Sequence, residues 1–190
     1  MVKNKIQCAV FISGRGSNLK SIFKYSKKKS SKINLKLVIS DKSDAKGIQF
    51  AKKNKIINKV VSYKNRIMAE KIIMNFLLKN EIKYIFLAGF MKILSKNIVK
   101  KFKNKIINIH PSLLPKYKGF NTHERAILNG EKFSGCTVHF VNYKLDSGKT
   151  ILQKRIKILK NDTPKTLAKR ILKIENKLYP MAIDKIFSKI

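Results

Sequence analysis

Short apolar runs alternate with segments of helical periodicity along almost the whole chain, and this alternation restricts the fold more than any other feature. The apolar runs read as buried strands, and the segments between them carry apolar residues at helical spacing. We expect strands at 6–12, 35–39, 56–61, 84–88, 105–109, 135–143 and 150–158. Strands that alternate with helices pair mostly in parallel, so the sequence predicts an α/β fold: a single-domain, mostly parallel twisted sheet with helices on both faces.

The helical segments give more local expectations. A helix should follow Ser17, which can act as its cap, and another should cover 66–78 with Ile67, Ile72, Phe76 and Leu77 near one face. The pair Thr163-Pro164 should open the last helix. No repeat or low-complexity linker interrupts the 190 residues, which indicates one domain over 1–190.

The charge is extreme, with a formal net value of +34. Such an excess is typical of nucleic-acid-binding proteins, but 39 of the 44 cations are lysines spread along the chain, without interleaved aromatic residues. We therefore favour solvated lysines over nucleic-acid binding, and expect the field to attract small anions. No apolar run is long enough to span a membrane. Cys8 and Cys136 lie in strand-like stretches, as expected of buried thiols in the cytoplasm.

The ends of two expected strands carry the first candidate sites. Ser13 to Asn18 form a glycine-rich turn before a helix, where backbone N–H groups can hold an anion. The turn matches neither a Walker loop nor the dinucleotide fingerprint, and a merely tight strand-to-helix turn is the alternative.

Asn108 and His110 are two residues apart on a strand, so both side chains should project from the same face. An amide donor beside an imidazole suits a developing oxyanion, although a lone histidine is more often structural.

A carboxylate is then needed to orient the imidazole, and Asp146 lies in a tight loop after another expected strand. His139 could point toward the same place or be a hydrogen-bonded core residue. The three histidines and two cysteines show no metal-ligand spacing, so we expect no metal. No Gly-x-Ser-x-Gly motif marks a hydrolase serine.

Taken together, these residues resemble the phosphoribosylglycinamide formyltransferases, folate-dependent enzymes of purine synthesis. The matching stretches run in family order over nearly the whole chain: Ile12–Gly14, Gly16–Leu19, Val38–Ser40, Leu87–Met91, Ile93–Leu94, Asn108–Tyr117, Thr122–His123, Val138–Val141, Leu145–Asp146, Gly148, Ile151–Gln153, Glu175 and Tyr179–Pro180.

The resemblance implies a formyltransferase fold with a Rossmann-like phosphate-binding half at 1–100 and a catalytic, folate-binding half at 101–190. It implies transfer of a formyl group from 10-formyltetrahydrofolate to the amino group of glycinamide ribonucleotide. Asn108 and His110 would donate to the oxyanion, and Asp146 would keep His110 protonated and position a relay water. The implied ribonucleotide-binding residues are Gly14, Arg15, Gly16, Ser17, Asn18 and Glu175. The implied folate-binding residues are Arg66, Met91, Lys92, Ile93, Leu94 and Asn108.

Rival interpretations are a formyltetrahydrofolate hydrolase or another formyltransferase of the same fold, such as a methionyl-tRNA formyltransferase. A basic nucleic-acid-binding protein on an inactive scaffold is the rival from another class. We expect small-molecule substrates, no specific nucleic acid, no membrane and a monomer or weak homodimer. The residues leave the roles of His123 and His139 open.

Overall fold

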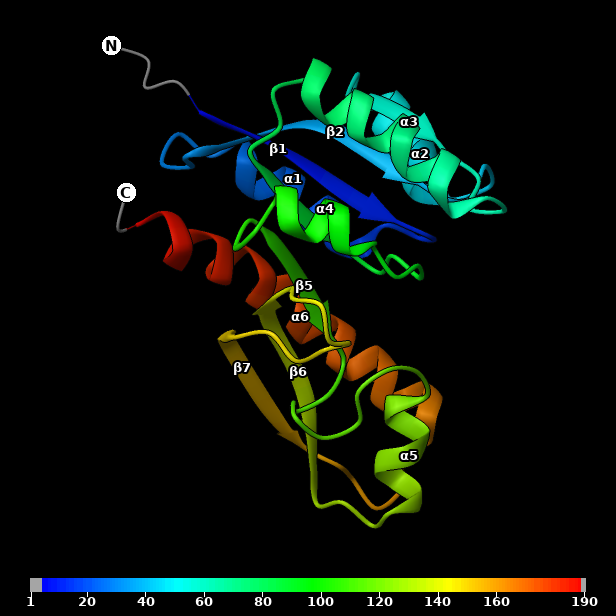
Figure 1. Ribbon diagram of the computed structural model, residues 1–190. Helices are drawn as coiled ribbons and strands as arrows, with labels where there is room; N and C mark the ends of the chain where they lie inside the picture. Colours follow the sequence, from blue (N-terminus) through cyan, green and yellow to red (C-terminus); the bar gives the residue numbers. More distant parts are fainter. Residues whose placement is uncertain (1–4, 189–190) are drawn as a thin grey trace. The chain divides into compact units, whose positions relative to one another are not determined.

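The structure of the protein, a computed structural model, describes residues 5–188 (Figure 1). These residues form two compact units, one up to Ile107 and the other from Asn108 onward, and each is described by itself below. The first contains β1 (Ile6–Ile12), α1 (Ser17–Ser26), β2 (Ile33–Ser40), α2 (Lys46–Lys53), β3 (Ile57–Val60), α3 (Arg66–Lys79), β4 (Tyr84–Leu87) and α4 (Lys96–Lys101). The second contains α5 (Thr122–Leu128), β6 (Phe133–Phe140), β7 (Thr150–Lys157) and α6 (Pro164–Phe187), and β5 (Ile106–His110) crosses the boundary.

In the first unit the strands follow the order β3-β2-β1-β4, and all three pairings are parallel. The chain moves outward from β1 to β3 and then returns to β4 on the other side of β1. Because crossover connections between parallel strands are right-handed, this reversal puts α1 and α2 on one face and α3 on the other. Figure 1 shows α1 behind the strands and α3 in front of them. Loops that follow β1 and β4 therefore meet at the point where the strand order reverses.

The face that α3 buries differs from the predicted one. Ala69, Ile73 and Leu77 are buried, at spacings of four residues, whereas Ile67 is 81% exposed and Ile72 is 39% exposed. The helix carries apolar residues almost all round, so periodicity alone could not choose between its faces. Of the four residues expected near one face, Leu77 is buried whereas Ile67 and Ile72 are exposed, so the four do not form the buried face of this helix.

Side chains cap the starts of α4 and α6, whereas α1 starts differently from the prediction. Ser95 accepts from Ile98 N at α4, and Thr163 forms a capping box with Thr166 at α6, with Pro164 as the first helical residue. At α1, however, the N-cap is Gly16 in a left-handed conformation, φ 73°, and Ser17 is already helical. The expected cap at Ser17 is therefore wrong.

In the second unit the strand order is β5-β6-β7, and β6 pairs with β7 in antiparallel register. The long helix α6 packs on β6 and β7 and also contacts α5. Its buried residues include Leu167, Ile171 and Leu178, which recur at helical spacing and form one apolar stripe.

Parallel strands alternate with helices in the first unit, and a strand pair packs against the long helix α6 in the second, so the predicted α/β class is confirmed. Both cysteines are free and buried. No helix within residues 5–188 has the length and apolar character needed to cross a membrane.

Candidate active site

The glycine-rich turn lies where the strand order of the first unit reverses. Ser13 connects it to the loop after β4, because Ser13 N donates to Gly89 O at 3.0 Å and Met91 N donates to Ser13 Oγ at 2.8 Å. Gly14 and Arg15 are exposed, while Gly16 and Asn18 are buried. The predicted phosphate loop, Gly14–Asn18, and the predicted folate loop, Met91–Leu94, are thus joined inside one unit.

Close backbone packing fixes the shape of this turn. Gly47, at the start of α2, donates its N–H to Gly14 O at 3.1 Å. A Cβ on Gly16 would lie 2.8 Å from Gly47 Cα, and one on Gly47 would lie 2.3 Å from Ile12 Cδ1. Sequence reasoning did not identify Gly47. Its three neighbours, Ile12, Gly14 and Gly16, are 31 to 35 positions earlier, so only the fold reveals the need for a glycine there.

Two cations of the first unit are held by buried carboxylates. Arg66 Nε lies 3.4 Å from Glu70 Oε1, and the same oxygen accepts from Ser95 N at 2.7 Å. Glu70 therefore links Arg66 to the residue that follows Met91–Leu94. Lys92 Nζ lies 3.7 Å from Asp41 Oδ2, and the Asp41 side chain is only 2% exposed. Met91 and Ile93 are exposed, while Leu94 is buried.

The second unit brings the three predicted catalytic side chains together. Asn108 and His110 lie on the same side of the end of β5, as the two-residue spacing predicted. Asp146 reaches both: its Oδ1 lies 3.5 Å from Asn108 Nδ2, and its Oδ2 lies 3.4 Å from His110 Nδ1. The side chains of His110 and Asp146 are 7% and 8% exposed, so little water screens their interaction.

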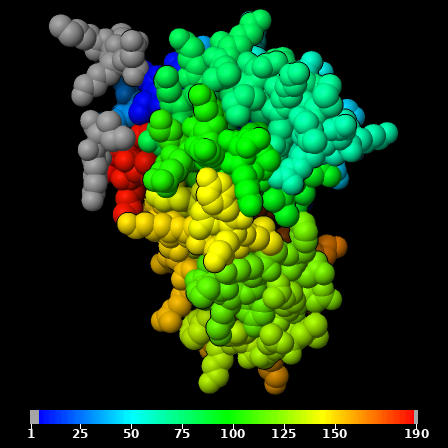
Figure 2. Space-filling view, in the orientation of Figure 1, coloured from blue at the N-terminus to red at the C-terminus, as the bar shows by residue number. Residues whose placement is uncertain are grey.

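Asp146 is positioned by the loop between β6 and β7. It has a positive φ of 44°, and Gly119 N donates to its Oδ2 at 2.9 Å. The loop is closed tightly, since Phe140 N donates to Lys149 O and a Cβ on Gly148 would lie 1.6 Å from Phe140 O. Tyr143 and Leu145 are more than half exposed, and the loop, drawn in yellow, lies at the molecular surface in Figure 2.

His139 belongs to the same cluster. Its Nδ1 lies 2.8 Å from Phe140 O, which only accepts, so Nδ1 carries the proton. Burial, the largest cause, lowers the pKa of His139, so the ring is neutral and Nε2 is an acceptor. Asn108 Nδ2 donates to Nε2 at 3.3 Å. His139 therefore fixes which end of the Asn108 amide faces the cluster.

His110 Nδ1 faces Asp146 Oδ2, and His110 Nε2 lies 2.8 Å from Tyr117 O. Both ring nitrogens therefore face acceptors. Each ring nitrogen can thus donate a hydrogen bond when it carries a proton. Burial lowers the pKa of His123, and the charge of nearby His110 lowers it further. His123 therefore lies within electrostatic range of His110 and is neutral.

Glu175, the remaining predicted binding residue, is buried on α6. Burial raises the pKa of the Cys136 thiol to about 12, and the charge of Glu175 contributes, so this carboxylate lies near β6.

The residues that sequence reasoning missed are Gly119, Tyr117, Gly47, Glu70 and Asp41. The first two act through backbone atoms, and the others act through contacts between distant segments, so no motif marks them.

The cluster on the second unit can stabilise negative charge and move a proton. The contacts of Asn108 Nδ2, at 3.3 and 3.5 Å, are at the long end for hydrogen bonds and therefore weak. An oxygen that gains negative charge can replace them with a shorter, charge-assisted bond. No group of three or more His, Cys, Asp or Glu among residues 5–188 is placed to hold a metal ion.

Comparison with known proteins agrees with this chemistry. The family described as formyl transferase matches residues 6–183. The human trifunctional purine biosynthetic protein adenosine-3 is 40% identical over 98% of this chain, which spans only 19% of that longer protein. Phosphoribosylglycinamide formyltransferase of Haemophilus influenzae is 39% identical over 92% of this chain and 84% of its own length. A solved structure of phosphoribosylglycinamide formyltransferase from Brucella melitensis has a TM-score of 0.91 at 36% identity, covering 96% of this chain and 95% of the other.

Proposed function

Because this chain belongs to the formyl transferase family, we propose that it transfers the formyl group of 10-formyltetrahydrofolate to the amino group of glycinamide ribonucleotide. The observation that carries the proposal is the cluster of Asn108, His110 and Asp146, with His110 Nδ1 3.4 Å from Asp146 Oδ2. It supplies a donor, an acid and a carboxylate in one place. The folate co-substrate supplies the formyl carbon on which the reaction occurs.

Asn108 and His110 stabilise the charge that develops on the formyl oxygen. When the substrate amine attacks the formyl carbon, Asn108 Nδ2 and the Nε2–H of His110 donate to that oxygen, the latter in place of its contact with Tyr117 O. His110 then passes a proton to the folate nitrogen as its bond to the formyl carbon breaks. The attacking amine loses one proton, and this proton balances the one that His110 gives up.

Asp146 supports both proton movements. Its carboxylate stabilises the protonated His110 ring and accepts, through a water molecule, the proton that leaves the amine. Gly119 N holds Oδ2 on the side of His110. His139 is a positioning residue in this scheme, since its Nε2 holds the Asn108 amide with the donor facing the cluster.

The binding residues that we propose lie in loops of the first unit and on α6. Backbone N–H groups of Gly14–Asn18, at the start of α1, hold the ribonucleotide phosphate, and Arg15 adds a positive charge. Glu175 accepts hydrogen bonds from a polar group of the ribonucleotide. Arg66 and Lys92 pair with the carboxylates of the folate tail, and the backbone of Met91–Leu94 binds its ring. We further propose a metal-independent cytoplasmic enzyme, monomeric or weakly dimeric, without specific nucleic-acid binding.

Consumption of 10-formyltetrahydrofolate with and without glycinamide ribonucleotide tests the proposal. Consumption only in the presence of the amine supports a transferase, whereas equal consumption without it indicates a hydrolase. No consumption under either condition contradicts the proposal. A steep loss of binding to DNA or RNA as salt rises would instead support the nucleic-acid alternative.

A further inference from the structure

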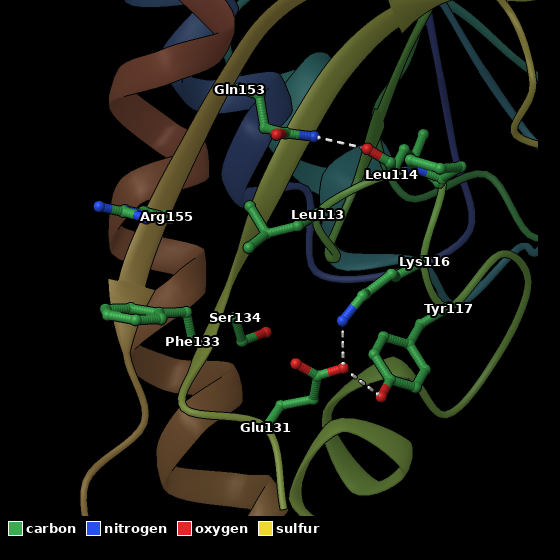
Figure 3. A pocket seen from close by; sticks show the side chains of 10 residues that line it. Leu113, Leu114, Lys116, Tyr117, Glu131, Phe133, Ser134, Gln153 and Arg155 are labelled. Carbon is green, nitrogen blue, oxygen red and sulfur yellow. Dashed lines mark hydrogen bonds and ion pairs between the residues drawn. The ribbon is translucent and has the colours of Figure 1, made fainter. Parts of the chain in front are cut away.

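A cavity of about 330 Å³ lies in the second unit, and its lining does not include Asn108, His110 or Asp146 (Figure 3). Its apolar lining comes mainly from Leu113, Leu114 and Phe133. Gln153 fixes one wall, because its Nε2 donates to Leu114 O at 3.0 Å and to Thr137 Oγ1 at 2.8 Å. These hydrogen bonds hold this wall of the cavity in place.

Two polar atoms of this cavity have no partner among residues 5–188. Glu131 Oε1 receives both Lys116 Nζ, at 2.7 Å, and the hydroxyl of Tyr117, at 2.9 Å, and this leaves Oε2 without a donor. Ser134 is 4% exposed, and its Oγ makes no hydrogen bond within the described residues. In Figure 3 this hydroxyl points into the cavity, and the free oxygen of Glu131 lies on the side toward Ser134.

These atoms define the edge of a complementary ligand. The hydrogen bonds from Lys116 and Tyr117 lower the pKa of Glu131, so its carboxylate is charged and accepts. The Ser134 hydroxyl can donate. A ring nitrogen next to an exocyclic amino group offers the matching pair, with the amino N–H directed to Glu131 and the ring nitrogen accepting from Ser134. Such rings are flat and largely apolar on their faces, as the leucine and phenylalanine walls require.

We propose that this cavity binds an amino-substituted nitrogen heterocycle, and that its occupancy is transmitted to His110 through Tyr117. Tyr117 connects the two places directly: its hydroxyl donates to Glu131, while its backbone oxygen lies 2.8 Å from His110 Nε2. Ser112 Oγ also donates to Lys116 O at 2.7 Å, which ties the segment before Tyr117 to the end of β5. Binding in this cavity does not depend on formyl transfer, so this proposal can be tested separately from the proposed function.

Calorimetric titration tests the site with adenosine and with free pterin, two compounds that each carry a ring nitrogen next to an exocyclic amino group. We expect saturable binding of at least one of them, and about tenfold weaker binding when the ring lacks the amino group, as in purine riboside compared with adenosine. Glu131→Gln presents a donor where the ligand amine donates, and Ser134→Ala removes the other partner, so each should weaken binding about tenfold or more. Lys132→Ala, at an exposed neighbour, is the matched control and should bind like the wild type.

Several outcomes overturn the proposal. Absence of saturable binding up to about 1 mM for both compounds refutes the site. Binding that Glu131→Gln and Ser134→Ala leave unchanged places the ligand elsewhere. The chain has three histidines, so the His110 ring signal can be followed by NMR during the titration. It should shift in the wild type and stay fixed in Glu131→Gln, and a bound ligand that leaves it unmoved refutes the link through Tyr117.

Discussion

Replacing Asn108 with alanine removes the amide donor on which the proposed chemistry depends most. Losing one donor to a developing oxyanion costs about 2.7–4 kcal/mol, or roughly a 100- to 1,000-fold decrease in kcat. The same replacement should cost less in the stability of the free enzyme than in the barrier of the reaction, because the amide contacts at 3.3 and 3.5 Å are long and therefore weak. Leaving the buried Nε2 of His139 without its donor costs about 1–3 kcal/mol in the free energy of unfolding.

The matched comparison is His139→Leu, which breaks the same hydrogen bond from the other side. It should destabilise the fold to a similar extent but keep the Asn108 donor, so kcat should fall by about tenfold or less. Steady-state formyl transfer below the melting temperature gives kcat and KM for both variants, and denaturant unfolding gives their stability. The two measurements separate the catalytic effect from the structural one.

The reasoning would be refuted if folded Asn108→Ala kept kcat within about tenfold of the wild-type value. Equal losses of kcat in both variants would show that the histidine does more than position the amide. A loss confined to KM would indicate that Asn108 binds the substrate without stabilising developing charge.

Three further predictions follow from particular contacts. Gly16→Val should raise the KM for glycinamide ribonucleotide in kinetic assays, because its Cβ would lie 2.8 Å from Gly47 Cα at a φ of 73°; an unchanged KM would contradict the phosphate role. Ile73→Ala should cost about 2–5 kcal/mol in denaturant unfolding, whereas Ile67→Ala, at a position that is 81% exposed, should change stability by less than about 0.5 kcal/mol; similar losses would contradict the face assigned to α3. The folded-state pKa of His139 lies below its ordinary value of 6.5, so the unfolded chain binds more protons in that range and stability should fall as pH drops below about 6.5. The pH dependence of unfolding between pH 8 and 5 should be shallower in His139→Leu, and an unchanged slope would contradict a neutral buried ring.

Some parts of the site could be read from local pattern. Asn108 and His110 share a face because strand side chains alternate with period two, and this needs no knowledge of neighbours. Asp146 was a candidate partner because it lies in a tight loop after another expected strand, the family resemblance added its role, and the structure brings the three together. The role of His139 could not be chosen from sequence, because a core histidine and a cluster member have the same apolar neighbours along the chain.

Other expectations failed where local signals were ambiguous. Ser17 is a good N-cap residue, but the left-handed backbone at Gly16 starts α1 one residue earlier than a serine cap would. The burial of Ile73 in place of Ile72 depends on which side of α3 meets the sheet, and a helix that is apolar almost all round does not encode that choice.

By itself the sequence determined the order of strands and helices, the buried character of each strand and the residue types available for chemistry, because these depend on periodicity and on neighbours along the chain. Only the tertiary structure decided that Glu70 joins Arg66 to Ser95, that Gly16 needs Gly47, and that Gly119 and His139 hold Asp146 and Asn108. Such contacts join segments brought together by sheet pairing and loop closure. Their energies depend on distances between atoms that are far apart in sequence, and no local pattern records those distances.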